Sequence, residues 1–444
     1  MHPLAVRYVI LPLHERLRRR PTMRYFRQLC RSQWWATEQL RHHQQQKLRR
    51  LLSRAAAAPF WAGRLRDAAI DPIKATLDDL PNLPTLDKRD LRDHQYDMLT
   101  ARRAAGLTDM TTGGSTGSPL HFAIDASRQA SDQAARARSR RWFAIEPGRR
   151  ELYLWGSPVE LRAQDRLKSL RDGLTNHRLL DAFCMTPASM TRYLRELRRY
   201  DPVHLFGYPS SIARLFRFAR SAGIAIDAPS LRAVFVTGEV FERMDRAAIE
   251  EAVAVPVADG YGSREGGFVA HQCPAGSYHV TMESHVVELL DEAGRAVAPG
   301  RTGEITLTHL DALAMPFIRY RTGDLARWAD RPCPCGRGLE SIESIEGRRT
   351  DMLRTTDGGH AHALSVIYVL RAEPCVAEFK VVQSANCDLD VWIVPREALD
   401  ADCHRRIVDR LRGRIGPAIT ARLHPVARIE PDPSGKHRHV VGAG

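Results

Sequence analysis

The chain contains few lysines, few cysteines and no long apolar run. Only six of its 66 basic residues are lysines, so arginine carries most of the formal net charge of +14. Eight cysteines among 444 residues are too few for a disulfide framework and fit a reducing compartment. No stretch approaches the roughly 20 apolar residues of a membrane span, and the apolar N-terminal segment lacks the length and cleavage site of a signal peptide. These absences predict a cytosolic protein.

Acidic residues are scarce at the N-terminus. Residues 1–66 hold fifteen basic residues against two acids, Glu15 and Glu38, so nearly all of the net charge lies in this segment. We expect residues 1–66 to form a basic helical arm. Such an arm suits an anionic membrane surface, a polyphosphate or nucleic acid, or it is simply a solvated helical face. Peripheral attachment to a membrane is therefore one candidate for its role.

The chain as a whole has a globular composition, with 43% hydrophobic and 27% charged residues. From about 107 to 262, short apolar runs alternate with amphipathic stretches, which predicts βαβ units on a largely parallel sheet. Strand-like runs from 278 to 328 predict a β-rich subdomain, and another α/β pattern follows Gly347. We predict an α/β fold in which residues 67–347 form a large domain and residues 348–444 a small C-terminal domain. Strands are expected at 151–155, 203–208, 233–237, 255–259, 286–290, 304–309 and 317–321, and helices at 127–142, 189–200, 211–222 and 243–252.

Residues 111–119 read TTGGSTGSP, a loop rich in glycine and hydroxyl groups. Glycines let successive backbone N–H groups turn inward as a nest for an anion, and the hydroxyls add donors. The loop is not a Walker A motif, because no lysine follows Gly117. It does contain the Gly-x-Ser-x-Gly pattern of a serine-hydrolase elbow, centred on Ser115. A phosphate site, a nucleophile and an ordinary turn are the alternatives.

Three further segments carry candidate ligand-binding residues. The segment DGYGSREGG at 259–267 follows an apolar run, so it lies at the carboxyl end of a strand, where open α/β sheets bind ligands. Tyr261 could stack on a base and Glu265 could hold magnesium. Asp324 ends the segment RYRTGD, and an acid at that position can bind ribose hydroxyls. Lys436 lies in the segment PSGK. The alternatives are a glycine-rich hairpin, a turn with ion-paired arginines, and a lysine placed there by chance.

The order and spacing of these segments resemble the adenylate-forming superfamily of acyl- and aryl-CoA ligases. The nearer resemblance is to the phenylacetate–CoA ligase family and its relatives in polysaccharide gene clusters. The likeness extends from about residue 35 to the C-terminus. It rests on TTGGSTGSP (111–119), FGYPSS (206–211), TGEVF (237–241), YGSREGG (261–267), MPFIRYRTGD (315–324), CPCGRG (333–338), EGRRTD (346–351) and SGK (434–436).

This resemblance implies a nucleotide site. The loop at 112–117 would embrace the ATP phosphates, and Glu239 and Tyr261 would frame the adenine. Asp324 would bind the ribose hydroxyls, with Arg348 beside it. The phosphate-binding residues implied are Thr112, Gly114, Ser115, Thr116 and Gly117.

The resemblance also implies an AMP-forming ligase that activates a small carboxylic acid as an acyl-adenylate and passes the acyl group to a thiol, most simply coenzyme A. Glu265, with Thr116, would position Mg²⁺. Lys436, on a mobile small domain, would bridge the carboxylate oxygen and the α-phosphate. Tyr208 and Trp155 are candidates for the acyl pocket.

Other readings stay open beside this one. The acceptor is alternatively a carrier protein, or a sugar hydroxyl or amine. A serine hydrolase and a nucleotide-binding scaffold without turnover are alternatives of other classes, and no nucleic acid partner is expected. The family often has an Asp-Asp pair after its Gly-Arg, the first acid acting as a hinge. Here Thr350 stands where that acid is expected, which leaves the pivot open.

Four cysteine and histidine residues form a separate pattern. Two ligand pairs, one following the segment 261–267 and one following Asp324, suit a tetrahedral structural Zn²⁺. Such an ion would clip together the two ends of the β-rich stretch. The alternatives are ordinary buried thiols or a redox pair. The candidate ligands are Cys273, His279, Cys333 and Cys335, while Cys30, Cys184, Cys375, Cys387 and Cys403 show no pairing logic and are expected in the core.

Overall fold

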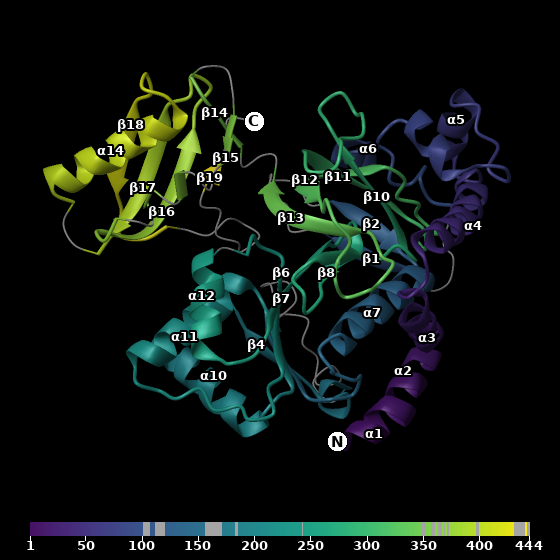
Figure 1. The fold of residues 1–444 in the computed structure, drawn as a ribbon, viewed down its shortest axis with the longest axis horizontal. Helices are drawn as coiled ribbons and strands as arrows, with labels where there is room; N and C mark the ends of the chain where they lie inside the picture. The colour runs from purple at the N-terminus through teal and green to yellow at the C-terminus, as the bar shows by residue number, and fades with distance from the viewer. Residues whose placement is uncertain are drawn as a thin grey trace. The chain divides into compact units, whose positions relative to one another are not determined.

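The computed structural model describes residues 1–100, 107–111, 120–155, 171–182, 185–241, 243–348, 352–356, 360–362, 366–367, 369–370, 373–396, 399–429 and 440–441. These residues fall into two compact units. Those up to Glu346 form the first, and those from Gly347 onward form the second (Figure 1). Among the described helices, none combines the length and the hydropathy that a membrane crossing requires.

The first 66 residues are helical, as the sequence predicted. Helix α4 buries Leu40, Leu48 and Leu51 completely, a spacing that keeps apolar side chains on one helix face. Trp61 of α5 is equally buried, and all four belong to the largest core of the first unit. The helices are α1 (Pro3–Ala5), η1 (Val6–Ile10), α2 (Leu11–Leu17), α3 (Thr22–Ser32), α4 (Thr37–Ala55), α5 (Pro59–Asp67), η2 (Leu77–Asn82) and α6 (Lys88–Asp93).

The first unit is built on a sheet that has eleven strands in the described residues, in the order β10-β11-β12-β13-β9-β8-β7-β6-β5-β3-β4. Strands β4, β3, β5, β6 and β7 pair in parallel over four or five residues each. Helices α10, α11 and α12 share a core with these strands (Figure 1). The bounds are β3 (Glu151–Trp155), β4 (His177–Asp181), β5 (His204–Gly207), β6 (Ala233–Thr237), β7 (Val257–Ser263), α10 (Pro187–Tyr200), α11 (Pro209–Ser221) and α12 (Arg243–Ala252).

From β8 onward the sheet is antiparallel, so the β-rich stretch continues the parallel strands within one sheet. The predicted α/β fold class is confirmed. Strand β12 begins at Tyr320, three residues later than expected, because Arg319 has a left-handed backbone (φ 51°) that interrupts the extended chain. These strands are β8 (Gly267–Gln272), β9 (Tyr278–Val280), β10 (His285–Leu290), β11 (Thr302–His309), β12 (Tyr320–Trp328) and β13 (Ser341–Arg348).

A two-stranded hairpin flanks the glycine-rich loop. Strand β1 (Thr108–Thr111) pairs antiparallel with β2 (His121–Ile124), ending at the pair Thr111 and His121. Residues 112–119 themselves lie outside the described residues. A nucleophile elbow requires a helix directly after its serine. The first described element after the loop is strand β2 and not a helix, so no described residue supports the serine-hydrolase alternative.

The second unit is a small α/β unit. Its four-stranded sheet has the order β18-β17-β16-β19, and α14 (Ala401–Ile415) shares its core. Cys375, just before β16, forms a disulfide with Cys403 in the first turn of α14, so the expectation that these two cysteines are unpaired is wrong. Packing of the helix against the strand brings together residues 28 apart in sequence. The strands are β14 (Met352–Arg354), β15 (His360–His362), β16 (Val376–Gln383), β17 (Leu389–Pro395), β18 (Ala421–Pro425) and β19 (Val440–Val441).

Candidate functional site

Aromatic side chains gather where the parallel strands β3, β5 and β6 end. Trp155 is the last residue of β3 and Tyr208 follows β5, and their rings stack with centroids 4.0 Å apart and planes at 16°. Gly238 follows β6 with φ 83°, and a Cβ there would lie 3.1 Å from Tyr208 and 3.3 Å from Trp155. The carboxyl edge of an open α/β sheet is where ligands bind. The structure therefore brings together the two residues considered for the acyl pocket.

The hairpin between β7 and β8 starts beside this stack. Thr237, at the end of β6, donates a hydrogen bond from its hydroxyl to the carbonyl of Gly260 at 2.5 Å. Tyr261 follows in β7, and the strand pairing closes at Ser263 and Gly267. Glu265 lies half-buried in the turn between them. The predicted magnesium residue is thus held in a tight turn rather than on a long loop.

A bulge in β12 brings Asp324 to Tyr261. The register between β11 and β12 shifts next to Ile305. This single residue of β11 lies opposite residues 322–324 of β12. Gly323 adopts φ 80°, a left-handed conformation that residues with side chains rarely take. Bulges of this kind re-aim side chains near functional sites. Here the hydroxyl of Tyr261 donates a hydrogen bond to Oδ2 of Asp324 at 2.8 Å.

Helix α7 (Ala126–Arg141) supports the β7–β8 turn. Nη2 of Arg128 donates to the carbonyl oxygens of Arg264 at 2.8 Å and Glu265 at 2.6 Å. One turn along the helix, Oδ1 of Asp132 accepts a hydrogen bond from the backbone N–H of Phe268 at 2.9 Å. Arg128 is buried, so these bonds form where water does not compete for them. The turn that carries Glu265 is therefore fixed through its backbone.

His285 adds a third support to the same turn. Its Nε2 lies 2.8 Å from the carbonyl oxygen of Gly266, and burial lowers the pKa of its imidazole to about 3, so the ring is neutral. Asp132, His285 and His309 place potential metal-binding atoms within 4.8 Å of one another. Both nitrogens of His285 are already engaged, however, because Nδ1 lies 3.0 Å from the hydroxyl of Ser284. We interpret the cluster as a hydrogen-bonded support of the turn.

Sequence reasoning did not identify Arg128, Asp132 or His285. Arg128 and Asp132 lie four residues apart on an Arg-rich helix, a pattern that solvated helix faces also show. Only the packing of α7 against β8 distinguishes these buried charges from exposed ones.

The structure describes the remaining predicted site residues only in part. The carboxylate of Glu239 accepts a hydrogen bond from the backbone N–H of Ser210, in the first turn of α11, at 3.3 Å. Arg348 is the last residue of β13, and its side chain is outside the described part of the chain. Lys436, Thr350 and the loop 112–117 also lie outside the described residues.

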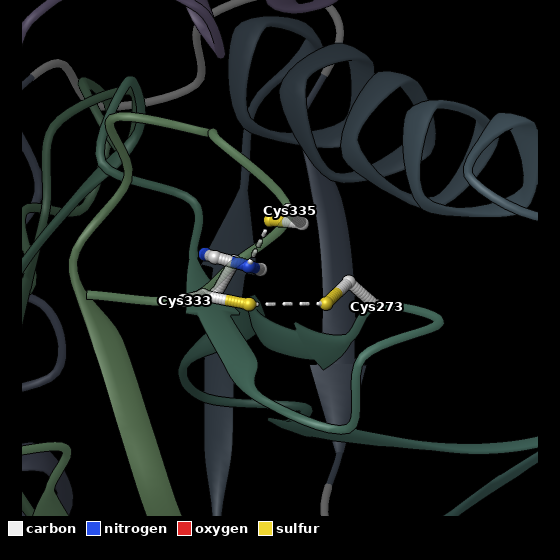
Figure 2. Close-up of side chains that lie close together, drawn as sticks. Cys273, Cys333 and Cys335 are labelled. Carbon is white, nitrogen blue, oxygen red and sulfur yellow. Dashed lines mark hydrogen bonds between the residues drawn. The ribbon is translucent and has the colours of Figure 1, made fainter. Parts of the chain in front are cut away.

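The four candidate zinc ligands lie together at the β9 side of the sheet. Their ligand atoms are all within 4.8 Å of one another. Figure 2 shows the sulfur of Cys273 facing that of Cys333, 3.6 Å away, and the sulfur of Cys335 lies 3.1 Å from Nε2 of His279. Two thiolates on one tetrahedral Zn²⁺ would be about 3.8 Å apart, given Zn–S bonds of roughly 2.3 Å. The residues present therefore fit a zinc ion.

Two matching turns present the cysteines. Both have the sequence Cys-Pro-x-Gly, one at 273–276 and one at 333–336. In each, the glycine N–H donates to the carbonyl of the first cysteine, at 2.8 Å and 3.3 Å, and the glycine is left-handed, with φ 90° for Gly276 and 76° for Gly336. The repeat can be read directly from the sequence, although the prediction of a zinc site used only the spacing of the ligand residues.

The protonation of His279 also suits metal binding. Nδ1 lies 3.4 Å from the carbonyl oxygen of Leu339, which leaves Nε2 to face Cys335. Burial lowers the pKa of His279 to about 4, so the imidazole is neutral. Burial also raises the pKa of Cys273 to about 12. A metal ion would replace the thiol proton that burial otherwise retains.

Comparison with known proteins agrees with this geometry. A family model described as "AMP-binding enzyme" matches residues 169–310. A phenylacetate-coenzyme A ligase of Thermus thermophilus is 26% identical, over 91% of this chain and 96% of its own. Protein CapK of Staphylococcus aureus is 22% identical, over 86% of this chain and 84% of its own.

A solved structure shares the fold across both units. A 2-hydroxyisobutyryl-CoA ligase, crystallised in a postadenylation state with an acyl-AMP, superposes with a TM-score of 0.71 at 22% identity, covering 89% of this chain and 88% of that one. At this identity the likeness establishes the fold. The carboxyl-edge site, the family match and the full-length relatives converge: this chain is a relative of the phenylacetate–coenzyme A ligases and has the fold of the adenylate-forming ligases.

Proposed function

We propose that this protein is an ATP-dependent, AMP-forming ligase that activates a small carboxylic acid and transfers its acyl group to the thiol of coenzyme A. The observation that carries the proposal is the hydrogen bond between Tyr261 and Asp324 at the edge where the parallel strands end. It joins two residues expected to contact one nucleotide. The end-to-end similarity to a phenylacetate-coenzyme A ligase supports the same chemistry.

The reaction runs in two balanced steps. A carboxylate oxygen attacks the α-phosphorus of ATP and pyrophosphate leaves, which gives the acyl-adenylate. The thiolate of coenzyme A then attacks the acyl carbon, and AMP leaves with the bonding electrons. The first step brings an anion against a polyanion, so it requires cations placed where negative charge develops. Glu265 would hold Mg²⁺ there, and Lys436 would bridge the carboxylate and the α-phosphate.

The nucleotide would lie across the ends of the strands. Asp324 would accept hydrogen bonds from the ribose hydroxyls, while Tyr261 and Glu239 would frame the adenine. Tyr261 holds Asp324 through a hydrogen bond to one carboxylate oxygen, which orients the carboxylate. The loop 112–117 would bind the phosphates, and Arg348 would lie near the ribose.

The stacked pair Trp155 and Tyr208 would line the acyl pocket. Gly238 leaves no room for a side chain against them, because a Cβ would meet both rings. A flat aromatic wall favours a planar or compact acyl group. We therefore infer an aromatic or short-chain acid as the substrate class.

Pyrophosphate release tests the proposal. The protein is incubated with MgATP and a panel of aromatic and short-chain acids, and pyrophosphate is measured with and without coenzyme A. Acid-dependent release and a coenzyme A thioester are the expected products. Acid-dependent release that yields product only with an amine, a sugar or a carrier protein would move the acceptor to the second alternative. ATP binding without release for any acid would indicate a nucleotide-binding scaffold.

We also propose that Cys273, His279, Cys333 and Cys335 bind a structural Zn²⁺. The ion would join the β8–β9 turn to the connection between β12 and β13. Support comes from the tetrahedral spacing of the ligand atoms and from the two matching turns. Elemental analysis of protein purified without chelators should give about one zinc per chain. A cytosolic location stays a prediction, supported by the need for ATP and coenzyme A.

A further inference from the structure

The N-terminal helices expose an apolar face. Among the described residues, half of the exposed large apolar side chains belong to the first seventeen residues. Their exposed fractions lie between 55% and 76%. From Leu4 to Val9, Leu13 and Leu17 they recur at intervals of five, four and four residues. The interval of five spans part of the π-helical turn Val6–Ile10, whose wider turn keeps these residues on one side. The residues are Met1, Leu4, Tyr8, Val9, Leu13 and Leu17.

The opposite face of the same helices is fixed to the first unit. Val6 is completely buried, and Gly148 approaches so closely that a Cβ there would lie 2.8 Å from the carbonyl oxygen of Pro3. The N-terminal amine donates to the side chain of Asn176 at 3.0 Å, and Arg7 pairs with Glu146 at 3.1 Å. The exposed apolar face therefore belongs to helices that are anchored to the first unit on their other side.

Exposed positive charge lies in the same helices and in the next one along the chain. The one acid of the segment, Glu15, is buried and is neutralised by Arg20, 2.6 Å away. Six further arginines of α2, α3 and the turn between them are exposed, and none forms an ion pair within the described part of the chain. Because no ion pair among the described residues neutralises these six arginines, the surface that they form is strongly cationic. These arginines are Arg16, Arg18, Arg19, Arg24, Arg27 and Arg31.

We propose that the apolar face of η1 and α2, together with the exposed arginines of α2 and α3, binds the surface of an anionic lipid bilayer. Aliphatic and aromatic side chains beside arginines are the combination by which interfacial helices bind such membranes. A second copy of the chain fits less well, because a two-fold contact would bring the same arginines together. Nucleic acid would use the arginines but leave the apolar residues in water.

This surface adds a location to the activity. Because the helices are anchored to the first unit, membrane binding would hold that whole unit at the lipid surface without inserting a spanning segment. The enzyme could then deliver its product to a membrane-bound acceptor. The inference does not depend on the proposed reaction, since the surface and its charge stand without it.

Vesicle flotation of the full chain tests the proposal. The protein is mixed with vesicles of phosphatidylcholine alone, or of equal parts phosphatidylcholine and phosphatidylglycerol. We expect flotation with the anionic vesicles only, decreasing as salt screens the arginines. The triple variant Tyr8→Gln, Val9→Gln, Leu13→Gln should lower the floated fraction about tenfold or more, because glutamine keeps helix propensity while removing apolar area.

A matched control replaces three equally exposed apolar residues elsewhere. The variant Ile73→Gln, Tyr96→Gln, Met244→Gln changes side chains with exposed fractions of 48% to 75%, and it should float like the wild type. The variant Arg24→Gln, Arg27→Gln should weaken flotation and its salt dependence. Pyrophosphate release, measured in parallel, should be equal for all variants, which separates this test from that of the reaction.

Three outcomes would overturn the proposal. The first is no flotation with anionic vesicles at low salt. The second is an equal loss of flotation in the matched control. The third is a wild type that forms dimers in sedimentation experiments without lipid and becomes monomeric in the Tyr8, Val9, Leu13 variant, which would assign the face to a second copy of the chain.

Discussion

Tyr261 and Asp324, 63 residues apart in the sequence, are joined by a hydrogen bond of 2.8 Å from the phenol to the carboxylate. Burial and the nearby carboxylate raise the pKa of Tyr261 well above its ordinary value, so the hydroxyl keeps its proton and acts as the donor. The bond exists because a bulge in β12 turns Asp324 toward Tyr261 of β7. It gives the carboxylate a fixed direction before any ligand arrives.

Asp324→Ala should raise the KM for ATP in pyrophosphate release by roughly 10- to 100-fold, the cost of losing hydrogen bonds to a charged group. Tyr261→Phe keeps the ring and removes only the hydroxyl, so its effect should be smaller. The comparison separates ribose binding by the acid from positioning by the phenol. An unchanged KM in Asp324→Ala would contradict the ribose assignment.

Lys436→Ala should lower the rate of adenylation by about 10²- to 10³-fold, since it removes one preorganised charge from a phosphoryl-type transition state. ATP binding should persist. Thioester formation from a preformed acyl-adenylate should suffer much less. Lys380→Ala, in β16 of the same unit, is the matched control and should behave like the wild type. An adenylation rate of Lys436→Ala within a few-fold of the wild-type rate would contradict the catalytic role assigned to Lys436.

Cys335→Ser should lower both the zinc content and the thermal unfolding midpoint, because one ligand of a closed tetrahedral site is lost. Cys387→Ser, which alters a half-buried free cysteine in the other unit, is the control and should keep its zinc. Elemental analysis and calorimetry measure the two effects. Metal-free wild-type protein, or equal zinc in both variants, would count against the site.

Arg128→Met should lower kcat more than it raises the KM for ATP. The variant removes the donors to the carbonyls of Arg264 and Glu265 while keeping an apolar stem of similar length. A hydrogen bond from a charged group typically contributes about 1.5–3 kcal/mol, so its loss should let the turn move. A shift in the Mg²⁺ concentration needed for activity would show that Glu265 has moved. An unfolding midpoint that falls while kcat and the Mg²⁺ requirement stay unchanged would indicate a purely structural role.

Asp259 should make stability depend on pH. Burial raises its pKa to about 7, from 3.8, and Tyr278 donates to it at 2.5 Å. The folded protein therefore binds this proton more tightly, so the stability it contributes is complete below about pH 4 and is lost as pH rises through about 7. Between about pH 5 and about pH 8, the unfolding midpoint should fall less for Asp259→Asn than for the wild type. The exposed Asp67→Asn is the control, and parallel profiles for all three proteins would refute the prediction.

The candidate nucleotide residues could be proposed from sequence because each belongs to a short local segment. A glycine-containing turn at the end of an apolar strand keeps its pattern wherever the strand lies in the sheet. Five of the seven predicted strands and all four predicted helices were located to within two residues at each end. Burial on one face of a sheet or helix gives the apolar residues a regular spacing, which can be read from the sequence. The four candidate metal ligands were similarly visible, because they form two pairs of residues that are close in sequence.

Other features depend on contacts that no local pattern encodes. The support of the 264–268 turn by Arg128, Asp132 and His285 arises only when α7 packs against β8 and when the first residue of β10 comes close to the same turn. The bond between Cys375 and Cys403 likewise depends on helix α14 lying against the start of β16.

In the arginine-rich N-terminus, some features follow from the sequence and others only from the tertiary structure. Composition alone determined that residues 1–66 are basic and helical. Which of its apolar side chains enter the core and which face outward was decided by the tertiary structure, because Val6 meets the close backbone at Gly148 while Tyr8 and Leu13 stay largely exposed. The spacing of apolar residues along a helix can show that its two faces differ. Only the element that packs against the helix determines which face is buried.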